Sequence, residues 1–416
     1  MNDGAILVSA GSRAASGYGK MSRSWQQFAA AWPILLAVAI LCIAGLAAIS
    51  AINSREAQAQ LIYIVVGAVA FFAIQRTHYR HVGWWAWGFY LLCLLLLIYM
   101  MIAPERSGFL CVPRINGYRS WIDLKVISLQ PAELTKIAFV MLLARYLRFR
   151  SNYRTAVGLL PPMALALTPV LLILQQQDVG TCLTFIPALF AMLFVAGAKW
   201  RHLLFLVCLG VLLAPVAWLS GPARTGGPDL PFFRHMPTLI RPNQRARVLA
   251  MFSHDPRTLN ESGFQQHKAL IALGSGGLLG KGYGHVPIGR TVPEAQNDMV
   301  LSLIGEQFGF VGVAVVIICY CVLFACGLEI AAATKDPFGR LLAVGLVSIL
   351  AGETFLNLMV TTRLMPVTGL TLPFVSYGGS SLLTCFIALG LLVSISRNRP
   401  IVFGPEAFEF SAKRTM

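Results

Sequence analysis

Three charged side chains lie beside apolar stretches of the sequence and could do chemistry there: Glu133, Lys136 and Asp298. Glu133 and Lys136 follow Gln130-Pro131, a pair that is typical of a helix start. In one interpretation Glu133 caps this helix and Lys136 extends to the membrane interface. In the other, the two residues form an ion pair on one helix face that points into a polar cavity. The spacing alone allows both.

Asp298 directly precedes an apolar segment that runs toward Phe308, at the end of a long polar stretch. Partial desolvation raises the pKa of a carboxyl group into the range that suits a general base. The alternative is an ordinary acidic residue near a helix start, where the helix dipole favours negative charge. On sequence alone, Glu294 and Glu306 are equal candidates for the role of base.

A glycine-rich run from Gly274 to Gly284 contains Lys281 and resembles a phosphate-binding loop. It does not fit the Walker pattern, because Ser275 stands where the first glycine belongs and Gly282 follows the lysine. Its backbone N–H groups and Lys281 could still meet a diphosphate. The alternative is a flexible turn after a short helix, which we expect at 260–273.

The composition excludes a water-soluble protein. Hydrophobic residues make up 57% of the 416 residues and charged residues only 12%, about half the charged share of soluble domains. The net charge is +16. The basic residues that produce it lie between apolar segments, which favours contact with anionic lipids over nucleic acid. Eight of the nine cysteines lie in apolar runs, so we expect neither a disulfide framework nor a zinc site.

Hydropathy predicts an all-α integral membrane protein with ten transmembrane helices, since about 20 apolar residues cross a bilayer. We expect them at 28–52, 57–75, 82–103, 133–148, 156–174, 179–197, 203–219, 308–328, 341–360 and 375–396. Keeping 133–148 as a span places Arg145, Arg148, Arg150 and Arg154 on the inner side, as the positive-inside rule requires. Both termini are then cytoplasmic, and a large extracytoplasmic loop at 220–307 joins the seventh and eighth helices.

The simplest division is one membrane domain at 25–397 between two cytoplasmic tails, 1–24 and 398–416. The first apolar run is long enough to span the bilayer and has no small-residue cleavage site after it. We therefore expect no cleaved signal peptide.

Four sequence blocks resemble the SEDS family (shape, elongation, division and sporulation), which includes FtsW and RodA. The first begins at Arg119 and reads RSWIDL, followed by SLQPAELTK, and the second begins at Gln177 and reads QDVGT. The third begins at Gln244 and reads QRARVL, followed by GSGGLLGKG and PEAQND. The fourth begins at Gly369 and reads GLTLPFVSYGGSS. The resemblance covers roughly residues 28–397. The chain departs from the family pattern at several positions: Asn297 replaces a common Thr, Met299 a common Phe and Glu353 a common Gln, and the Pro of the QPD motif is missing.

The resemblance implies a peptidoglycan glycosyltransferase that polymerises lipid II in the bacterial cytoplasmic membrane and releases undecaprenyl diphosphate. It makes Asp298 the catalytic residue. The expected substrate-binding residues are Arg119, Glu133, Lys136, Arg245, Arg247, Lys281 and Ser376. No cofactor is certain, although a divalent cation, Mg²⁺ or Mn²⁺, could neutralise the leaving group.

The expected partners are a class B penicillin-binding protein, which is a transpeptidase, and other divisome or elongasome membrane proteins, but not nucleic acid. The branch, division or elongation, stays open. The alternative function is a lipid II flippase without polymerase activity, because intramembrane charges also occur in transporters.

Overall fold

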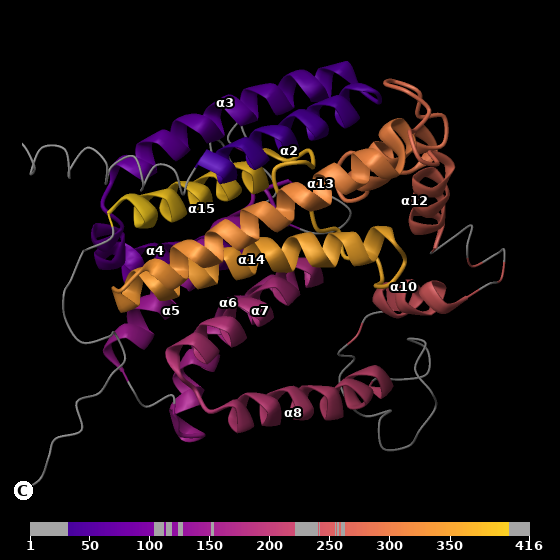
Figure 1. The fold of residues 1–416 in the computed structure, drawn as a ribbon. Helices are drawn as coiled ribbons and strands as arrows, with labels where there is room; N and C mark the ends of the chain where they lie inside the picture. Colours follow the sequence, from indigo (N-terminus) through magenta and orange to yellow (C-terminus); the bar gives the residue numbers. More distant parts are fainter. Residues whose placement is uncertain are drawn as a thin grey trace, which may run out of the picture.

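The computed structural model describes residues 32–103, 112–113, 119–123, 128–150, 154–220, 240, 242–253, 255, 258 and 263–398. The two predicted tails lie outside these residues, apart from Asn398. The described chain is a bundle of long helices (Figure 1), and the only strands within it are the short antiparallel pair β1 (Ile122–Asp123) and β2 (Ser128–Leu129). The predicted all-α membrane fold is confirmed.

Ten long helices correspond to the ten predicted segments. They are α2 (Trp32–Ser50), α3 (Ser54–Arg76), α4 (Tyr79–Ile102), α5 (Pro131–Phe149), α6 (Leu160–Gln175), α7 (Val179–Ala196), α8 (Trp200–Leu219), α13 (Val300–Ala333), α14 (Pro337–Thr361) and α15 (Gly379–Arg397). In the described chain nine of these are long and apolar enough to cross a membrane, α6 being counted with the short helix η2 (Val157–Leu159). Helix α5, which carries four charged residues, is the tenth, so a count of ten spans stays a prediction.

Helices α5 and α14 form the centre of the bundle. Most residues of α5 are buried on every side, which is the pattern of a helix surrounded by other helices rather than by lipid. Gly345 of α14 allows this closeness, because a side chain there would collide with Val140 of α5 and Met192 of α7. The charged residues near the start of α5 are therefore held inside the protein.

Helices α2, α3 and α15 pack together with α13 on one side of this centre, whereas α8 lies apart from the bundle (Figure 1). Of the 20 residues of α8, only Leu203 is buried. Its exposed leucines, valines and phenylalanine would be costly in water and suit contact with lipid.

The region between α8 and α13 contains α10 (Pro242–Phe252), α12 (Phe264–Ser275) and the short 3-10 helix η4 (Gly289–Thr291). The short helix expected at 260–273 is observed as α12. Helix α13 begins at Val300, eight residues before the predicted start at 308, and bends at Gly309. The prediction began only near the bend. The segment before it, residues 300–307, is also helical and is buried, and residues 276–284 pack against it through backbone hydrogen bonds from Lys281 to Glu306 and from Gly282 to Gln307.

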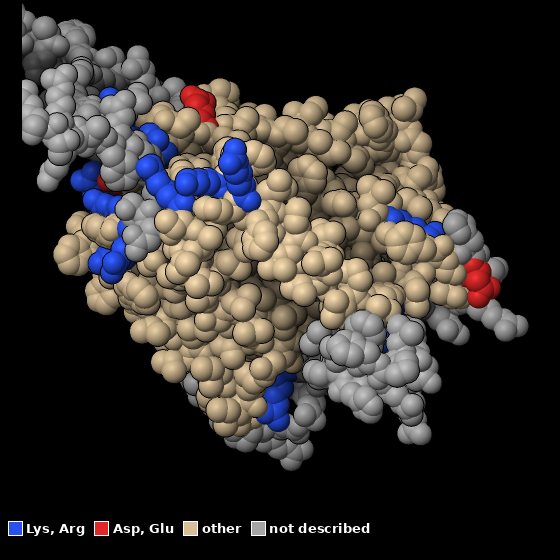
Figure 2. Space-filling view, turned by 90° about the horizontal axis from the view of Figure 1, so that it is seen from below, with Lys and Arg blue, Asp and Glu red and all other residues tan. Residues whose placement is uncertain are grey.

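Basic residues gather at one end of the bundle. Arg80 and Arg148 both contact Asp336, at 3.5 Å and 3.9 Å, and so tie together the ends of α4, α5 and α14. Figure 2 shows Lys and Arg concentrated mainly toward one end of the face it presents, while most of that face carries neither charge. This distribution is what an apolar belt in contact with lipid requires.

Candidate active site

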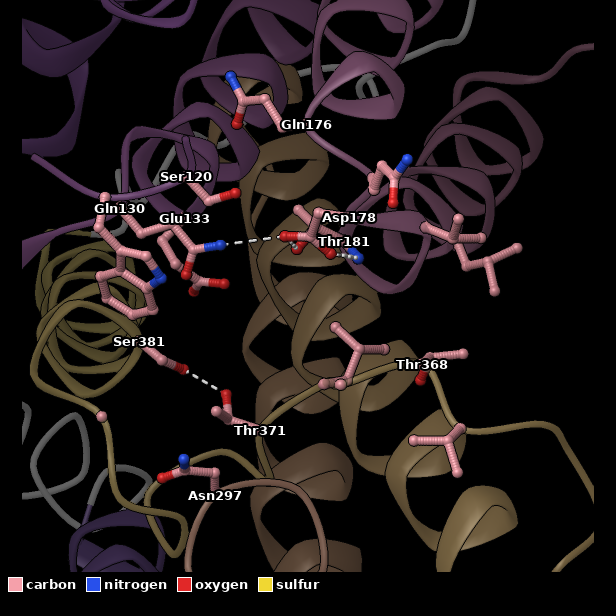
Figure 3. Close-up of a pocket in the computed structure, with 18 of the residues that line it drawn as sticks. Ser120, Gln130, Glu133, Gln176, Asp178, Thr181, Asn297, Thr368, Thr371 and Ser381 are labelled. Carbon is pink, nitrogen blue, oxygen red and sulfur yellow. Dashed lines mark hydrogen bonds between the residues drawn. The ribbon is translucent and has the colours of Figure 1, made fainter. Parts of the chain in front are cut away.

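A cavity of about 940 Å³ opens at the opposite end of the bundle, where α5 and α7 begin. Its lining comes from the starts of α5 and α7, from α10, from Asn297, and from the segments 365–371 and 377–381. Figure 3 shows Gln130, Glu133, Asp178 and Thr181 along one wall and Asn297 at the other side. These segments meet because α5, α7 and α15 start, and α6 and α14 end, at this level of the bundle.

A buried ion cluster supports the first wall, which we call the acidic wall and define by Glu133, Gln176 and Asp178. Lys136 is 1% exposed and donates a 2.8 Å hydrogen bond to Glu133 Oε1 and a second one to Glu353 of α14. The sequence left open whether Lys136 reaches the interface or pairs with Glu133, and the ion pair is confirmed. Glu133 lines the cavity, whereas Lys136 lies behind it.

Asp178 caps the start of α7. Its Oδ1 accepts from the backbone N–H of Thr181 at 2.9 Å, and its Oδ2 accepts from the Thr181 hydroxyl at 2.7 Å and from Gln130 Nε2 at 3.0 Å. Burial raises the pKa of Asp178, against the effect of these hydrogen bonds. The residue joins the start of α5 to the start of α7 and so fixes the width of the acidic wall.

Asp298 lies just before α13 and is 7% exposed. Gln265 of α12 donates to its Oδ1 at 2.7 Å, and Asn357 of α14 donates to its backbone carbonyl at 2.8 Å. Burial raises the pKa of Asp298 to about 7, while the Gln265 hydrogen bond and the charge of Arg247 act in the opposite direction. A carboxyl group with this pKa can accept and return a proton near neutral pH.

Of the predicted cations, Arg247 lines the cavity and lies close enough to Asp298 to influence its charge. Arg119 donates to the backbone carbonyl of Ala103, and the buried Arg245 donates to that of Ser220. Lys281 pairs with the fully buried Glu306 at 2.5 Å. These three cations are not part of the cavity lining, and their substrate-binding roles stay predictions.

Ser376 is also absent from the lining. Its hydroxyl accepts the backbone N–H of Leu372 at 2.8 Å, and its carbonyl accepts from Gln60 of α3 at 3.0 Å. The residue closes the turn that precedes α15. Nothing in this geometry tests the predicted contact of Ser376 with substrate.

Comparison with known proteins identifies the family. Residues 26–400 match the model of the FtsW, RodA and SpoVE cell cycle proteins. Stage V sporulation protein E of Bacillus subtilis is 32% identical, over 82% of this chain and 87% of its own length. A probable peptidoglycan glycosyltransferase FtsW of Geobacter metallireducens is 34% identical over 81% and 84%.

A solved peptidoglycan synthase complex, described in terms of polymerization and crosslinking, contains a chain of the same fold. Its TM-score is 0.71, with 28% identity over 89% of this chain and 98% of that one. The chain belongs to the FtsW, RodA and SpoVE family. The SEDS membership and the glycosyltransferase activity expected from the sequence are thereby confirmed.

No cluster of three or more His, Cys, Asp or Glu ligands occurs within the part of this SEDS chain that the structure describes. Glu133 Oε2 is the one carboxylate oxygen of the acidic wall that is buried without a partner among those residues, since the oxygens of Asp178 already accept hydrogen bonds. A divalent cation would therefore need ligands from the substrate, as Mg²⁺ often does when it binds phosphates. The divalent cation stays a prediction.

Sequence reasoning missed three residues of this SEDS site: Gln176, Asp178 and Gln265. Asp178 belongs to a block used for the family resemblance, but no role followed from the motif. Gln176 is the middle one of three glutamines, 175–177, that precede Asp178. This polar run at the end of an apolar helix was the available signal. Gln265 gave no signal, because only the fold brings α12 next to Asp298.

Proposed function

We propose that this SEDS glycosyltransferase polymerises lipid II on the outer face of the bacterial cytoplasmic membrane, with Asp298 as general base. The observation that carries the proposal is the buried Asp298 carboxyl, with a pKa of about 7, beside Asn297 and Arg247 of a large membrane-protein cavity. The positive-inside rule supports the orientation, because the basic end of the bundle lies opposite the cavity. Both termini are then cytoplasmic.

In the proposed reaction, a hydroxyl group of the acceptor sugar attacks the anomeric carbon of the donor chain. The new C–O bond forms as the bond between that carbon and the diphosphate oxygen breaks, and undecaprenyl diphosphate leaves. Asp298 accepts the hydroxyl proton, which is help worth about 10²- to 10⁴-fold in rate. Arg247 is better placed than Lys136 to meet the charge on the leaving group, because two carboxylates already surround Lys136.

The proposed partner is a class B penicillin-binding protein, a transpeptidase that would crosslink the new glycan. A solved chain of this fold belongs to a peptidoglycan synthase complex, which supports such a partner. Other divisome or elongasome membrane proteins would join the same assembly. The names of the relatives include both sporulation and FtsW proteins, so localisation of a fluorescent fusion to septum or side wall would decide the branch.

Reconstitution in liposomes with lipid II tests the activity. We expect the wild type to make glycan, and Asp298→Asn to lose at least about 10²-fold in rate while eluting as a folded protein. Glu329→Gln is the matched control, since it removes an exposed carboxylate near the far end of α13, and it should keep its activity. Movement of lipid II between leaflets without glycan would instead support a flippase, and full activity of Asp298→Asn would remove Asp298 as the base.

A further inference from the structure

Three polar atoms of the acidic wall are buried without a hydrogen-bond partner among the described residues. They are both side-chain amide atoms of Gln176 and Oε2 of Glu133. Gln176 is 6% exposed and Glu133 is 5% exposed, and both line the cavity. A buried polar group without a partner is costly, and natural proteins keep few of them. Three on one cavity wall indicate that a ligand completes their hydrogen bonds.

The backbone holds Gln176 in place independently of its side chain. Its N–H donates to the carbonyls of Ile173 and Leu174 at the end of α6, and Gln177 then turns the chain with φ of 63°. Asp178 follows as the cap of α7. Figure 3 shows Gln176 on the same side of the cavity as Ser120, Gln130 and Asp178. The carboxamide is thus presented by two helix ends that are both fixed.

The charge around these atoms restricts what they bind. Glu133 and Asp178 are both acidic, and Lys136, the cation that pairs with Glu133, lies behind the wall between Glu133 and Glu353. A diphosphate would be repelled here, whereas the guanidinium of Arg247 faces the same cavity from α10. A neutral sugar carries several hydroxyl and acetamido groups that both donate and accept, so different groups of one sugar unit can satisfy a carboxamide and a carboxylate oxygen at separate positions.

We propose that Gln176 and Glu133 form the subsite for the sugar of the substrate, while the diphosphate lies toward Arg247. The Gln176 carboxamide exchanges one donated and one accepted hydrogen bond with the sugar, and Glu133 Oε2 accepts a further one. This assignment rests on the proposed function, because it names which part of lipid II the acidic wall recognises. It also gives Lys136 the task of holding Glu133, not that of binding phosphate.

The test uses Gln176→Met, which keeps the side-chain volume and removes both polar atoms. Binding is measured in the Asp298→Asn background, so that lipid II is not consumed, with lipid II and undecaprenyl diphosphate as separate probes. We expect Gln176→Met to bind lipid II about tenfold more weakly and undecaprenyl diphosphate unchanged. Equal weakening of both, or of neither, overturns the subsite.

Thermal unfolding of the ligand-free protein provides a second measurement. Gln176→Met should be at least as stable as its parent, because it removes buried polar atoms that have no partner in the fold. Gln60→Met is the matched control: Gln60 is also buried but bonds Ser376 and Gly378, so this variant should lose stability. A loss of stability in Gln176→Met equal to that of Gln60→Met would mean that the fold itself satisfies Gln176, and the subsite would be wrong.

The two proposals fail in different ways. If the parent protein binds lipid II no better than undecaprenyl diphosphate, sugar recognition is absent and the proposed function is in doubt. If the parent discriminates between the probes and Gln176→Met discriminates equally well, the proposed function stands and the assignment of Gln176 is wrong. Glycan formed in the Asp298→Asn background would count against Asp298 and leave the subsite to be judged by the stability measurement.

Discussion

Behind the acidic wall, the ammonium group of Lys136 has two carboxylate partners, whereas the carboxylate of Asp298, next to the cavity-lining Asn297, has one amide donor and a guanidinium nearby. Both groups are almost fully buried. In the first arrangement the ammonium group lies between two carboxylates, so removing it leaves both of them in an apolar interior without their cation. In the second arrangement the pKa of the carboxyl group lies near neutral pH, so the group can gain or lose a proton at little cost. The difference separates a structural use of buried charge from a chemical one.

The largest effect should come from breaking the buried ion cluster of Lys136, Glu133 and Glu353. Lys136→Met leaves Glu133 and Glu353 buried without their cation, and we expect the protein to lose about 3–5 kcal/mol of stability. Unfolding in mixed detergent micelles measures this loss. Lys199→Met, which removes an exposed lysine at the start of α8, is the control and should unfold like the wild type. An unchanged Lys136→Met would mean that the cluster does not support the fold.

The role of the Asp298 carboxyl group should be visible in the pH dependence of the reaction. Asp298 acts only without its proton, so with a pKa of about 7 the polymerisation rate should rise with pH and level off above that value. At pH 6 it should be about a tenth of the plateau. Gln265→Leu removes a donor that stabilises the charged form, which raises the pKa and moves the acid limb to higher pH.

Rates of polymerisation between pH 5.5 and 8.5 would show this shift. The matched control is Gln175→Leu, which changes an exposed glutamine at the end of α6 and should leave the limb in place. A limb that stays fixed in Gln265→Leu, or that moves to lower pH, would separate the observed ionisation from Asp298. The contrast between the Lys136 cluster and Asp298 would then lose its evidence for a chemical role of Asp298.

The Lys136 cluster and the surroundings of Asp298 also show what the sequence could predict. The start of α5 was predictable, because Gln130-Pro131 is a local signal and the structure begins the helix at Pro131. The partner of Lys136 was not, since Glu353 is 217 residues away and only helix packing joins them. Asp298 was found through its neighbours in sequence, but its donor Gln265 lies on a separate helix. Local patterns therefore identify charged groups better than they identify the partners that decide their roles.

Lys281 illustrates the same limit from the other direction. Its glycine-rich surroundings favoured a phosphate contact, yet its ammonium group pairs with Glu306, whose other oxygen accepts the backbone N–H of Gly289 at 2.7 Å. Glu306 was an equal candidate for the base on sequence alone. The fold instead uses it to join Lys281 to the backbone of Ile288 and Gly289, which no spacing rule could have predicted.

The smallest effect concerns the backbone that presents the acidic wall. Gln177 has a left-handed φ of 63°, a conformation that costs a residue with a side chain about 1 kcal/mol relative to glycine. A proline at this position, as the family pattern has, could not adopt that φ, so this chain turns into α7 in its own way.

We expect Gln177→Gly to be more stable than Gln177→Ala by about 1 kcal/mol, because both variants lose the glutamine side chain beyond Cβ and differ mainly in backbone freedom. The same pair at the helical Gln175 should show the opposite order, since glycine weakens a helix. Thermal unfolding of the four variants decides the matter, and an identical order at both positions would mean that the turn presenting Gln176 is not left-handed at Gln177.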